Sequence, residues 1–174
     1  MDADKNKIIA DRGKYFKKKE LYEAEGSVVI TDTEDNKMTT DRIEHYKNEN
    51  KIIGYENSKV YLNKGYIVSS DSLIYDTIKK EVKSNEYSTL IDLDGNKLDV
   101  DMFEYSFIKK IFASIGDIKL LDSIDNKHYF DELFIDTENN KMIGSNVRVD
   151  LNRENVNETY SKENEPRFVA NSSI

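Results

Sequence analysis

The residues whose types and spacing could support chemistry are, first of all, five aspartates that recur every thirty residues: Asp11, Asp41, Asp71, Asp101 and Asp131. A row of carboxylates could act as an acid ladder, but the equal spacing indicates that each has the same local role in a repeated unit. Aspartate side chains commonly accept hydrogen bonds from nearby backbone amides. We therefore expect these aspartates to be structural residues at the points where strands begin.

Neither histidine lies in a pattern typical of a metal site. His45 and His128 belong to different repeats, the chain has no cysteine, and carboxylates would have to be brought in by the fold. The stretch 92–96 (DLDGN) faintly resembles a calcium loop, but its glycine comes too early for an EF-hand and no glutamate follows at the required position. We expect a hairpin turn there. The sequence thus predicts no catalytic residue, no metal and no cofactor, in a protein that is not an enzyme.

The elements that must position these residues are pairs of β-strands. An aromatic residue follows the aspartate in four repeats, at Tyr15, Tyr46, Tyr75 and Tyr105, and Ile135 takes this place in the fifth. Polar turns rich in Asn, Asp, Gly and Lys then separate two apolar runs in each repeat, and these residue types suit tight hairpins. The sequence therefore predicts an all-β fold of about ten antiparallel strands in five repeats of ~30 residues.

Apolar and polar residues alternate within the strands, as expected for a sheet with one dry and one wet face. The dry faces of all repeats must meet either one another or a ligand, so a trough suited to alkyl chains and a closed core both remain open. The phase of repeats two and three is also open, because a one-residue slip turns every side chain over. The residues expected to line the interior are Tyr22, Ala24, Val28, Ile30, Tyr55, Val60, Leu62, Tyr75, Leu90, Tyr105, Phe107, Ile111, Ala113, Ile115, Ile118, Leu120, Val147 and Val149.

Composition argues against several classes of protein. The 174 residues suffice for one domain, and 37% apolar with 34% charged residues is typical of a soluble domain with a thin core. A net charge of −8, with lysines at turn tips where we expect them to be solvated, argues against nucleic-acid binding. No stretch approaches the roughly twenty apolar residues of a membrane helix. The N-terminal MDAD is not a secretory signal, and the lack of cysteine leaves the redox compartment undecided.

One sequence unit recurs along the chain with variations. Residues 10–15 (ADRGKY) and 22–28 (YEAEGSV) have close copies in 113–120 (ASIGDIKL) and 143–149 (IGSNVRV), whereas 57–60 (NSKV) and 86–90 (EYSTL) lack the glycine. This unit resembles the OstA-like repeat of lipopolysaccharide (LPS) transport proteins, over residues 8–151. The resemblance implies a repetitive antiparallel β-jellyroll with an open V-shaped or tapered groove. Such a groove would bind LPS and pass it on without making or breaking a bond.

The stretch 164–168 (NEPRF) resembles the segment that joins the periplasmic domain of outer-membrane LPS-assembly proteins to their β-barrel. This resemblance implies an LptD-like periplasmic domain at residues 8–151 and a linker at 152–174, at the periplasmic face of the outer membrane, with signal peptide and barrel absent from the chain. The implied partners are LPS through its lipid A acyl chains, a periplasmic bridge protein by edge-strand pairing, and the outer-membrane lipoprotein that accompanies the barrel. Two alternatives are an LptA-like periplasmic bridge protein and a purely structural β-repeat or adhesion module with a closed core.

Overall fold

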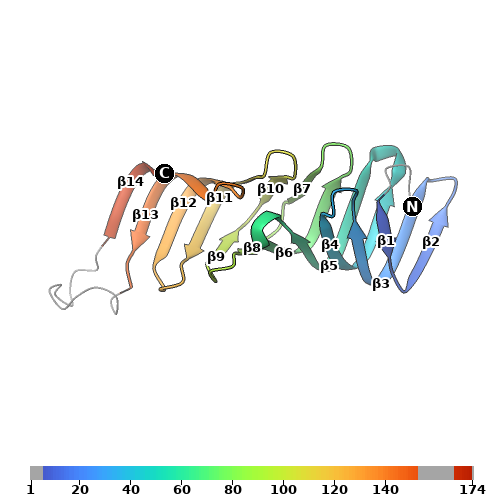
Figure 1. Cartoon of the computed structure of the whole chain (residues 1–174), viewed down its shortest axis with the longest axis horizontal. Coiled ribbons are helices and arrows are strands. Elements are labelled where there is room, and N and C mark those ends of the chain that lie inside the picture. Colours follow the sequence, from blue (N-terminus) through green and yellow to red (C-terminus); the bar gives the residue numbers. More distant parts are fainter. Residues whose placement is uncertain (1–5, 153–166, 174) are drawn as a thin grey trace.

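The computed structural model describes residues 6–152 and 167–173, and these form one antiparallel sheet of fourteen strands with two short 3-10 turns. The sheet is elongated, and its strands run across its long axis (Figure 1). The all-β antiparallel jellyroll expected from the sequence is therefore confirmed. The elements are β1 (Lys7–Ile9), β2 (Arg12–Phe16), β3 (Leu21–Thr31), β4 (Lys37–Tyr46), η1 (Lys47–Glu49), β5 (Lys51–Tyr61), η2 (Asn63–Gly65), β6 (Ile67–Asp76), β7 (Glu81–Ser84), β8 (Ser88–Ile91), β9 (Lys97–Val100), β10 (Phe103–Ser106), β11 (Ile111–Leu121), β12 (Lys127–Asp136), β13 (Lys141–Asp150) and β14 (Arg167–Ser173).

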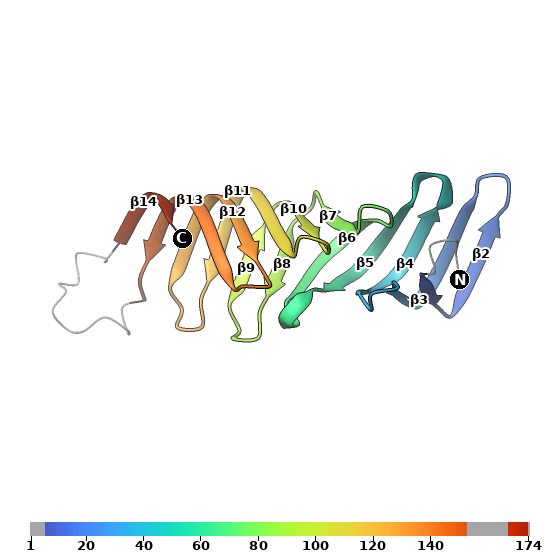
Figure 2. The same cartoon turned by 45° about the horizontal axis from the view of Figure 1, so that its top comes forward.

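The predicted ten strands are present between residues 7 and 150, but three of them are broken in the middle. The broken strands are the pairs β1 and β2, β7 and β8, and β9 and β10. In one such case β6 pairs with β7 through one half of its length and with β8 through the other half. The turns between strands lie in two rows along opposite margins of the sheet (Figures 1 and 2). We call them the upper turns (residues 17–20, 47–50, 77–80, 107–110 and 137–140) and the lower turns (residues 32–36, 62–66, 92–96 and 122–126).

The long strands bend near their middle, and the bends fold the sheet into two walls. In β3 the bend lies at Gly26 and Ser27, which have left-handed backbone angles (φ 83° and 46°) and shift the register against β4. A flat strand of ten residues spans about 33 Å. Nevertheless, Tyr75 near an upper turn is hydrogen-bonded, at 3.0 Å, to Asp32 of a lower turn. The two ends can meet only because the halves of the strands face each other across an interior. We call the line along which upper and lower turns approach each other the mouth.

The five periodic aspartates lie at the bends, in the middle of a strand or in the break between two half-strands: Asp11, Asp41, Asp71, Asp101 and Asp131. The prediction that they stand where strands begin is wrong, because the extended chain continues through each bend. Asp41 accepts a hydrogen bond from Asn57 Nδ2 at 2.6 Å, and Asp131 accepts one from Asn146 Nδ2 at 2.6 Å. Asp11 occupies the space that a Cβ at Gly26 would need, 2.3 Å from its Oδ2. These aspartates are structural, as expected.

The inner faces of both walls form one apolar core, built from rows of equivalent residues thirty positions apart. The row beside the bends consists of the small residues Ala24, Gly54, Ser84, Ser114 and Gly144. The row in the middle of one wall is larger and consists of Ile43, Leu73, Phe103 and Leu133. The row nearest the upper turns consists of His45, Tyr75, Tyr105 and Ile135. Side chains therefore become larger with distance from the bend, as required where two walls diverge.

The aromatic residue of the second repeat was predicted at Tyr46, and the structure corrects this by one position. His45 is the buried member of the row, with 2% of its surface exposed, while Tyr46 lies on the outer face and donates a hydrogen bond to Glu44 Oε2 at 2.6 Å. Tyr15, in the first repeat, is 49% exposed at the N-terminal end of the sheet. Sequence spacing alone misplaced Tyr46 because this repeat has an aromatic residue one position beyond the inward-facing one.

The last described strand changes the interpretation of the C-terminal segment. β14 pairs antiparallel with β13, from Asp150 opposite Arg167 to Gly144 opposite Ser173. Residues 167–173 therefore extend the sheet, and the prediction that all of 152–174 is a linker is wrong for this part. The remainder of the motif at 164–168 that suggested a barrel linker, residues 164–166, lies outside the described residues.

Candidate functional site

The structure places most of the predicted lining residues on the inner face. Three are half-buried and pack against the core: Tyr22, Leu120 and Val149. The buried ones are Ala24, Val28, Ile30, Val60, Leu62, Tyr75, Leu90, Tyr105, Phe107, Ile118 and Val147. Whether any of these residues contacts a lipid stays a prediction, because the chain is described without ligands.

The remaining four candidates, Tyr55, Ile111, Ala113 and Ile115, lie on the outer face, and for them the prediction is wrong. In β11 the residues that point inward are Phe112 and Ser114, at 0% and 2% exposure, while Ile115 is 59% exposed. The bend at residues 116–117 then separates Ile115 from the inward Ile118, so the predicted row joined two opposite phases.

Tyr55 is on the outer side for the same reason, because the bend at residues 56–57 separates it from the inward Val60. Its ring stacks under the Arg42 guanidinium, with 4.2 Å between the carbon Cζ and the ring centroid. The Tyr55 hydroxyl also donates to Glu44 Oε2 at 3.0 Å. These contacts hold the ring against neighbouring strands on the outer face.

Sequence reasoning missed about half of the interior, mainly the strands that lead from a lower turn to an upper turn. The thirty-residue spacing of apolar residues was the available signal, because it connects equivalent positions in every repeat even where period two is interrupted by a bend. The missed inward residues include Met38, Ile43, Ile52, Val68, Leu73, Val82, Leu98, Val100, Phe103, Phe112, Phe130, Leu133 and Ile135.

The two walls are packed against each other, so the interior has no open groove along this cluster. Its apolar members expose at most 7% of their surface. A crevice at the mouth, between Ile30, Val60, Tyr75 and Phe107, has a volume of only about 10 Å³. That is the lower limit for a single water molecule. The open V-shaped groove implied by the repeat resemblance is therefore closed here, since an acyl chain would need a continuous channel wider than one water.

The mouth is closed by a buried carboxylate. The Asp32 side chain is 1% exposed, accepts a hydrogen bond from the Tyr75 hydroxyl at 3.0 Å and pairs with Lys80 Nζ at 3.4 Å. Burial raises the pKa of the Asp32 carboxyl, but hydrogen bonds from Asn36, Glu34 and Tyr75 outweigh burial and hold its pKa below the usual 3.8. Burial, followed by the Asp32 charge, raises the pKa of Tyr75. At neutral pH an ionised carboxylate therefore links a lower turn to an upper one.

Further contacts cross the mouth beside this carboxylate. Lys64 in η2 donates to the backbone carbonyl of Glu138 in an upper turn. Tyr105, which lies beneath, is within hydrogen-bond distance of Thr137 Oγ1 at 3.2 Å. Its ring meets Phe107 edge to face at a centroid distance of 5.1 Å. Polar contacts therefore cover an aromatic layer, and no covalent bond joins the upper and lower turns among the described residues, in a chain without cysteine.

The lower turns share a pattern in which an aspartate closes the turn with an asparagine four residues later. Asp92 accepts from Asp94 N at 2.9 Å, Asn96 N at 2.9 Å and Asn96 Nδ2 at 2.7 Å. The same three bonds form at Asp32 with Asn36 and at Asp122 with Asn126. The carboxylate of Asp92 is thus used by its own turn, as the hairpin interpretation predicts.

The described residues contain no group of three or more His, Cys, Asp or Glu side chains arranged to hold a metal ion. His128 Nε2 is within 3.1 Å of the Asp122 carboxylate. This pair lies at a single lower turn, and hydrogen bonding from His128 contributes to holding the pKa of Asp122 below its usual value against the opposing effect of burial.

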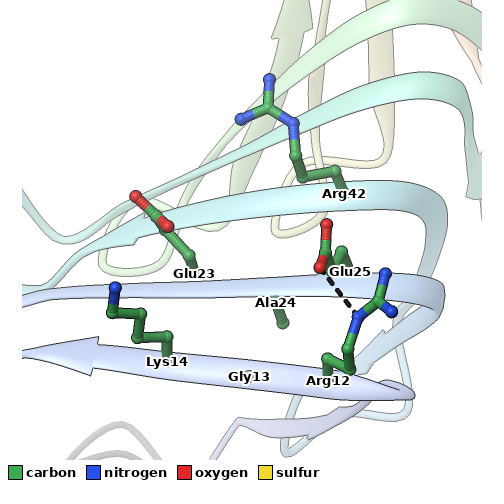
Figure 3. Close-up of a pocket in the computed structure, with 7 residues that line it drawn as sticks. All are labelled: Arg12, Gly13, Lys14, Glu23, Ala24, Glu25 and Arg42. Carbon is green, nitrogen blue, oxygen red and sulfur yellow. Dashed lines mark hydrogen bonds and ion pairs between the residues drawn. The ribbon is translucent and has the colours of Figure 1, made fainter.

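A depression of about 310 Å³ lies on the outer face at the N-terminal end of the sheet (Figure 3). Its charged side chains project from β2, β3 and β4, while Ala24 points to the other side (Figure 3). Arg12 Nε and Glu25 Oε1 form an ion pair at 2.9 Å, with 78% and 51% of the two side chains exposed. An ion pair this exposed contributes little stability. The depression is a solvated surface feature, separate from the apolar interior.

Comparisons with known proteins give one structural similarity. No protein-family model matches the chain, and no curated protein matches it. Among solved structures, the chain is similar to LptH of Pseudomonas aeruginosa, the LptA-homologous periplasmic component of the lipopolysaccharide transport device, with 13% identity and a TM-score of 0.31 over 95% of this chain and 94% of that one. Within residues 6–152 and 167–173 no helix is long and apolar enough to span a membrane.

Proposed function

We propose that this chain is an LPS-carrying β-jellyroll of the bridge type, which holds acyl chains between its two walls. The observation that supports this most is the uninterrupted apolar inner face, which extends from β3 to β13 and is built from every repeat. A ligand that runs along such a face must be long and apolar. The OstA-like repeat pattern, present in register over residues 8–151, points to the same class of ligand.

The closed interior is then the empty state, and loading separates the walls at the mouth. Opening breaks a few polar contacts, each worth about 0.5–1.5 kcal/mol net, and moves apolar side chains apart. Each methylene that enters contributes roughly 0.8 kcal/mol, so an acyl chain of about twelve carbons contributes roughly 10 kcal/mol. The ligand therefore supplies enough free energy to replace the wall-to-wall contacts that it displaces.

Edge strands give a route for transfer to neighbouring proteins. In the described part of the chain, β2 pairs only with β3 and β14 pairs only with β13, so each end of the sheet presents backbone donors and acceptors. Such edges can add a strand from a partner. We propose a periplasmic location between two such partners. The narrower assignment to an LptD-like assembly protein, with a barrel and a lipoprotein partner, stays a prediction.

The experiment that tests the proposal compares photo-crosslinkers at inward and outward positions of the same strand. Ile118 is 2% exposed and Ile115 is 59% exposed on β11. We expect LPS adducts from a crosslinker at Ile118 and none from one at Ile115, with circular dichroism and thermal unfolding confirming that both variants fold. A folded Ile118 variant that yields no adduct would show that the interior does not admit lipid.

A second experiment restrains the mouth. Lys64→Cys with Glu138→Cys, joined by a short bismaleimide, connects a lower turn to an upper turn. Lys79→Cys with Lys109→Cys joins two upper turns instead and serves as the matched control. We expect only the first crosslink to abolish LPS binding, because only it prevents the walls from separating. Equal binding by both crosslinked proteins would contradict entry through the mouth.

The second candidate function is a structural β-repeat module, which the closed core specifically favours. It predicts that both the Ile118 and the Ile115 crosslinkers fail to capture LPS while the protein remains folded. It also predicts that restraining the mouth has no effect on any binding. The two candidates therefore differ in the same two measurements.

A further inference from the structure

The two rows of turns that border the mouth carry opposite charge. The lower turns carry the acidic residues Asp32, Glu34, Asp35, Asp92, Asp94, Asp122 and Asp125, with Lys64 as their basic residue. The first four upper turns carry Lys17, Lys18, Lys19, Lys47, Lys79, Lys80, Lys109 and Lys110, with Glu20 and Glu49 as their acidic residues. The sequence shows lysines scattered through the chain. The fold gathers these lysines along one side of the mouth.

Two neighbouring upper turns have the same three residues, Ile-Lys-Lys, at 78–80 and 108–110. They are held side by side by a backbone hydrogen bond from Phe107 N to Lys80 O of 2.9 Å. Each turn is separated from the next by two strand spacings, roughly 10 Å. Four ammonium groups are therefore gathered within the span of one large headgroup.

The isoleucines of these turns are exposed, although nothing in a hairpin tip requires an apolar residue. Ile78 is 61% exposed and Ile108 is 67% exposed. Each projects next to two lysines at the border of the apolar interior. A surface that combines exposed aliphatic groups with lysines is complementary to an amphiphile that carries a negative charge close to its hydrocarbon.

The charges at these two turns differ in how far they are already neutralised. Lys79 Nζ lies 4.0 Å from the Asp76 carboxylate, and Lys80 is paired with Asp32 across the mouth. Lys109 and Lys110 make no ion pair within the described part of the chain, because Ser106 stands where the preceding repeat has Asp76. Opening of the mouth would also release Lys80 from Asp32. The loaded state therefore presents more positive charge than the closed state.

We infer that the upper turns at 77–80 and 107–110 bind the phosphate group of an amphiphile whose acyl chains enter the interior. This rests on the proposed function and adds an orientation to it. Lysine ammonium groups attract phosphate as point charges, while the acidic lower turns repel it. The headgroup phosphate therefore lies over the upper turns, and the exposed isoleucines contact the first methylenes below it.

The test measures binding of three lipids to the full chain: lipid A with its phosphates, the same lipid A after phosphatase treatment, and phosphatidylglycerol. The variant carries Lys109→Glu and Lys110→Glu. Its matched control carries Lys59→Glu and Lys119→Glu, which give the same charge change on exposed positions of β5 and β11. We expect the first variant to bind phosphorylated lipid A at least about tenfold more weakly, since each lysine near an anionic headgroup contributes roughly 1 kcal/mol. We expect its binding of dephosphorylated lipid A to be unchanged.

Equal affinity of the wild-type protein for the two forms of lipid A, or equal losses in the two variants, would overturn the inference and leave the proposed function standing. Failure of the wild-type protein to bind either form would refute both. A phosphatidylglycerol affinity with the same dependence on Lys109 and Lys110 would support the site and assign it to headgroup phosphate in general. Dependence with lipid A alone would support it and assign it to a sugar phosphate.

Discussion

The contact of Asp32 with Tyr75 and Lys80 can be tested against a second turn that lacks it. Asp32→Ala and Asp92→Ala each remove three hydrogen bonds of 2.7–3.0 Å within equivalent lower turns. Only Asp32 also accepts from the buried Tyr75 hydroxyl at 3.0 Å and pairs with Lys80 at 3.4 Å. The difference between the two substitutions therefore isolates the contact across the mouth.

The magnitude follows from the groups left behind. Losing the acceptor leaves the Tyr75 hydroxyl buried without its partner, which costs about 1–3 kcal/mol. Lys80 is partly exposed, so its ammonium can turn to water, and its lost pairing adds at most about 1 kcal/mol. We therefore expect Asp32→Ala to lower the free energy of unfolding by about 2 kcal/mol more than Asp92→Ala does. The assay is urea unfolding at neutral pH, followed by tyrosine fluorescence and circular dichroism.

A double-mutant cycle completes the experiment. Combining Asp32→Ala with Tyr75→Phe should reveal a coupling energy of about 1–2 kcal/mol, because the two side chains interact directly. Asp92→Ala combined with Tyr75→Phe should be additive. If Asp32→Ala and Asp92→Ala differed by less than about 0.5 kcal/mol and the cycle showed no coupling, the upper and lower turns would not meet through this carboxylate, and the closed mouth would be refuted.

Three further predictions concern packing and pH. Gly144→Ala should cost about 1–3 kcal/mol in chemical denaturation, because its Cβ would lie 2.3 Å from Phe130 Cδ1. Phe112→Ala should lower the free energy of unfolding by about 3–5 kcal/mol, while Phe134→Ala, at a 44% exposed outer position, should cost less than about 1 kcal/mol; equal costs would contradict the assigned strand phase. The lowered pKa of Asp32 contributes stability that is complete above 3.8 and is lost as pH falls through the folded-state pKa, so denaturation midpoints measured from pH 7 to pH 3 should fall less steeply for Asp32→Asn.

The repeat explains why the architecture could be predicted in advance. Turn residues at fixed offsets, period-two alternation and the thirty-residue spacing are local properties, and each repeat states them again. A mistake in one unit, such as placing the aromatic of the second repeat at Tyr46, therefore left the prediction of an all-β antiparallel chain of ten strands intact.

The phase of individual strands was less predictable, because it changes within a strand. The bends carry residues in left-handed conformations such as Ser27, Glu56 and Asn146, and these residue types do not announce a positive φ. Ile115 and Ile118 appear in the sequence as one apolar run, but the bend between them puts them on opposite faces. Comparison with the equivalent positions thirty residues away would have separated them.

The sequence by itself determined the repeat, the strand pairing between neighbours and the apolar character of one face, because all three depend on residues close together in the chain. Tertiary structure alone decided that the sheet folds at its aspartates, that its walls meet in a closed core, and that a lysine-bearing margin faces an acidic one. Those outcomes depend on contacts such as that between Asp32 and Tyr75, which lie 43 residues apart and become neighbours only when both walls are in place.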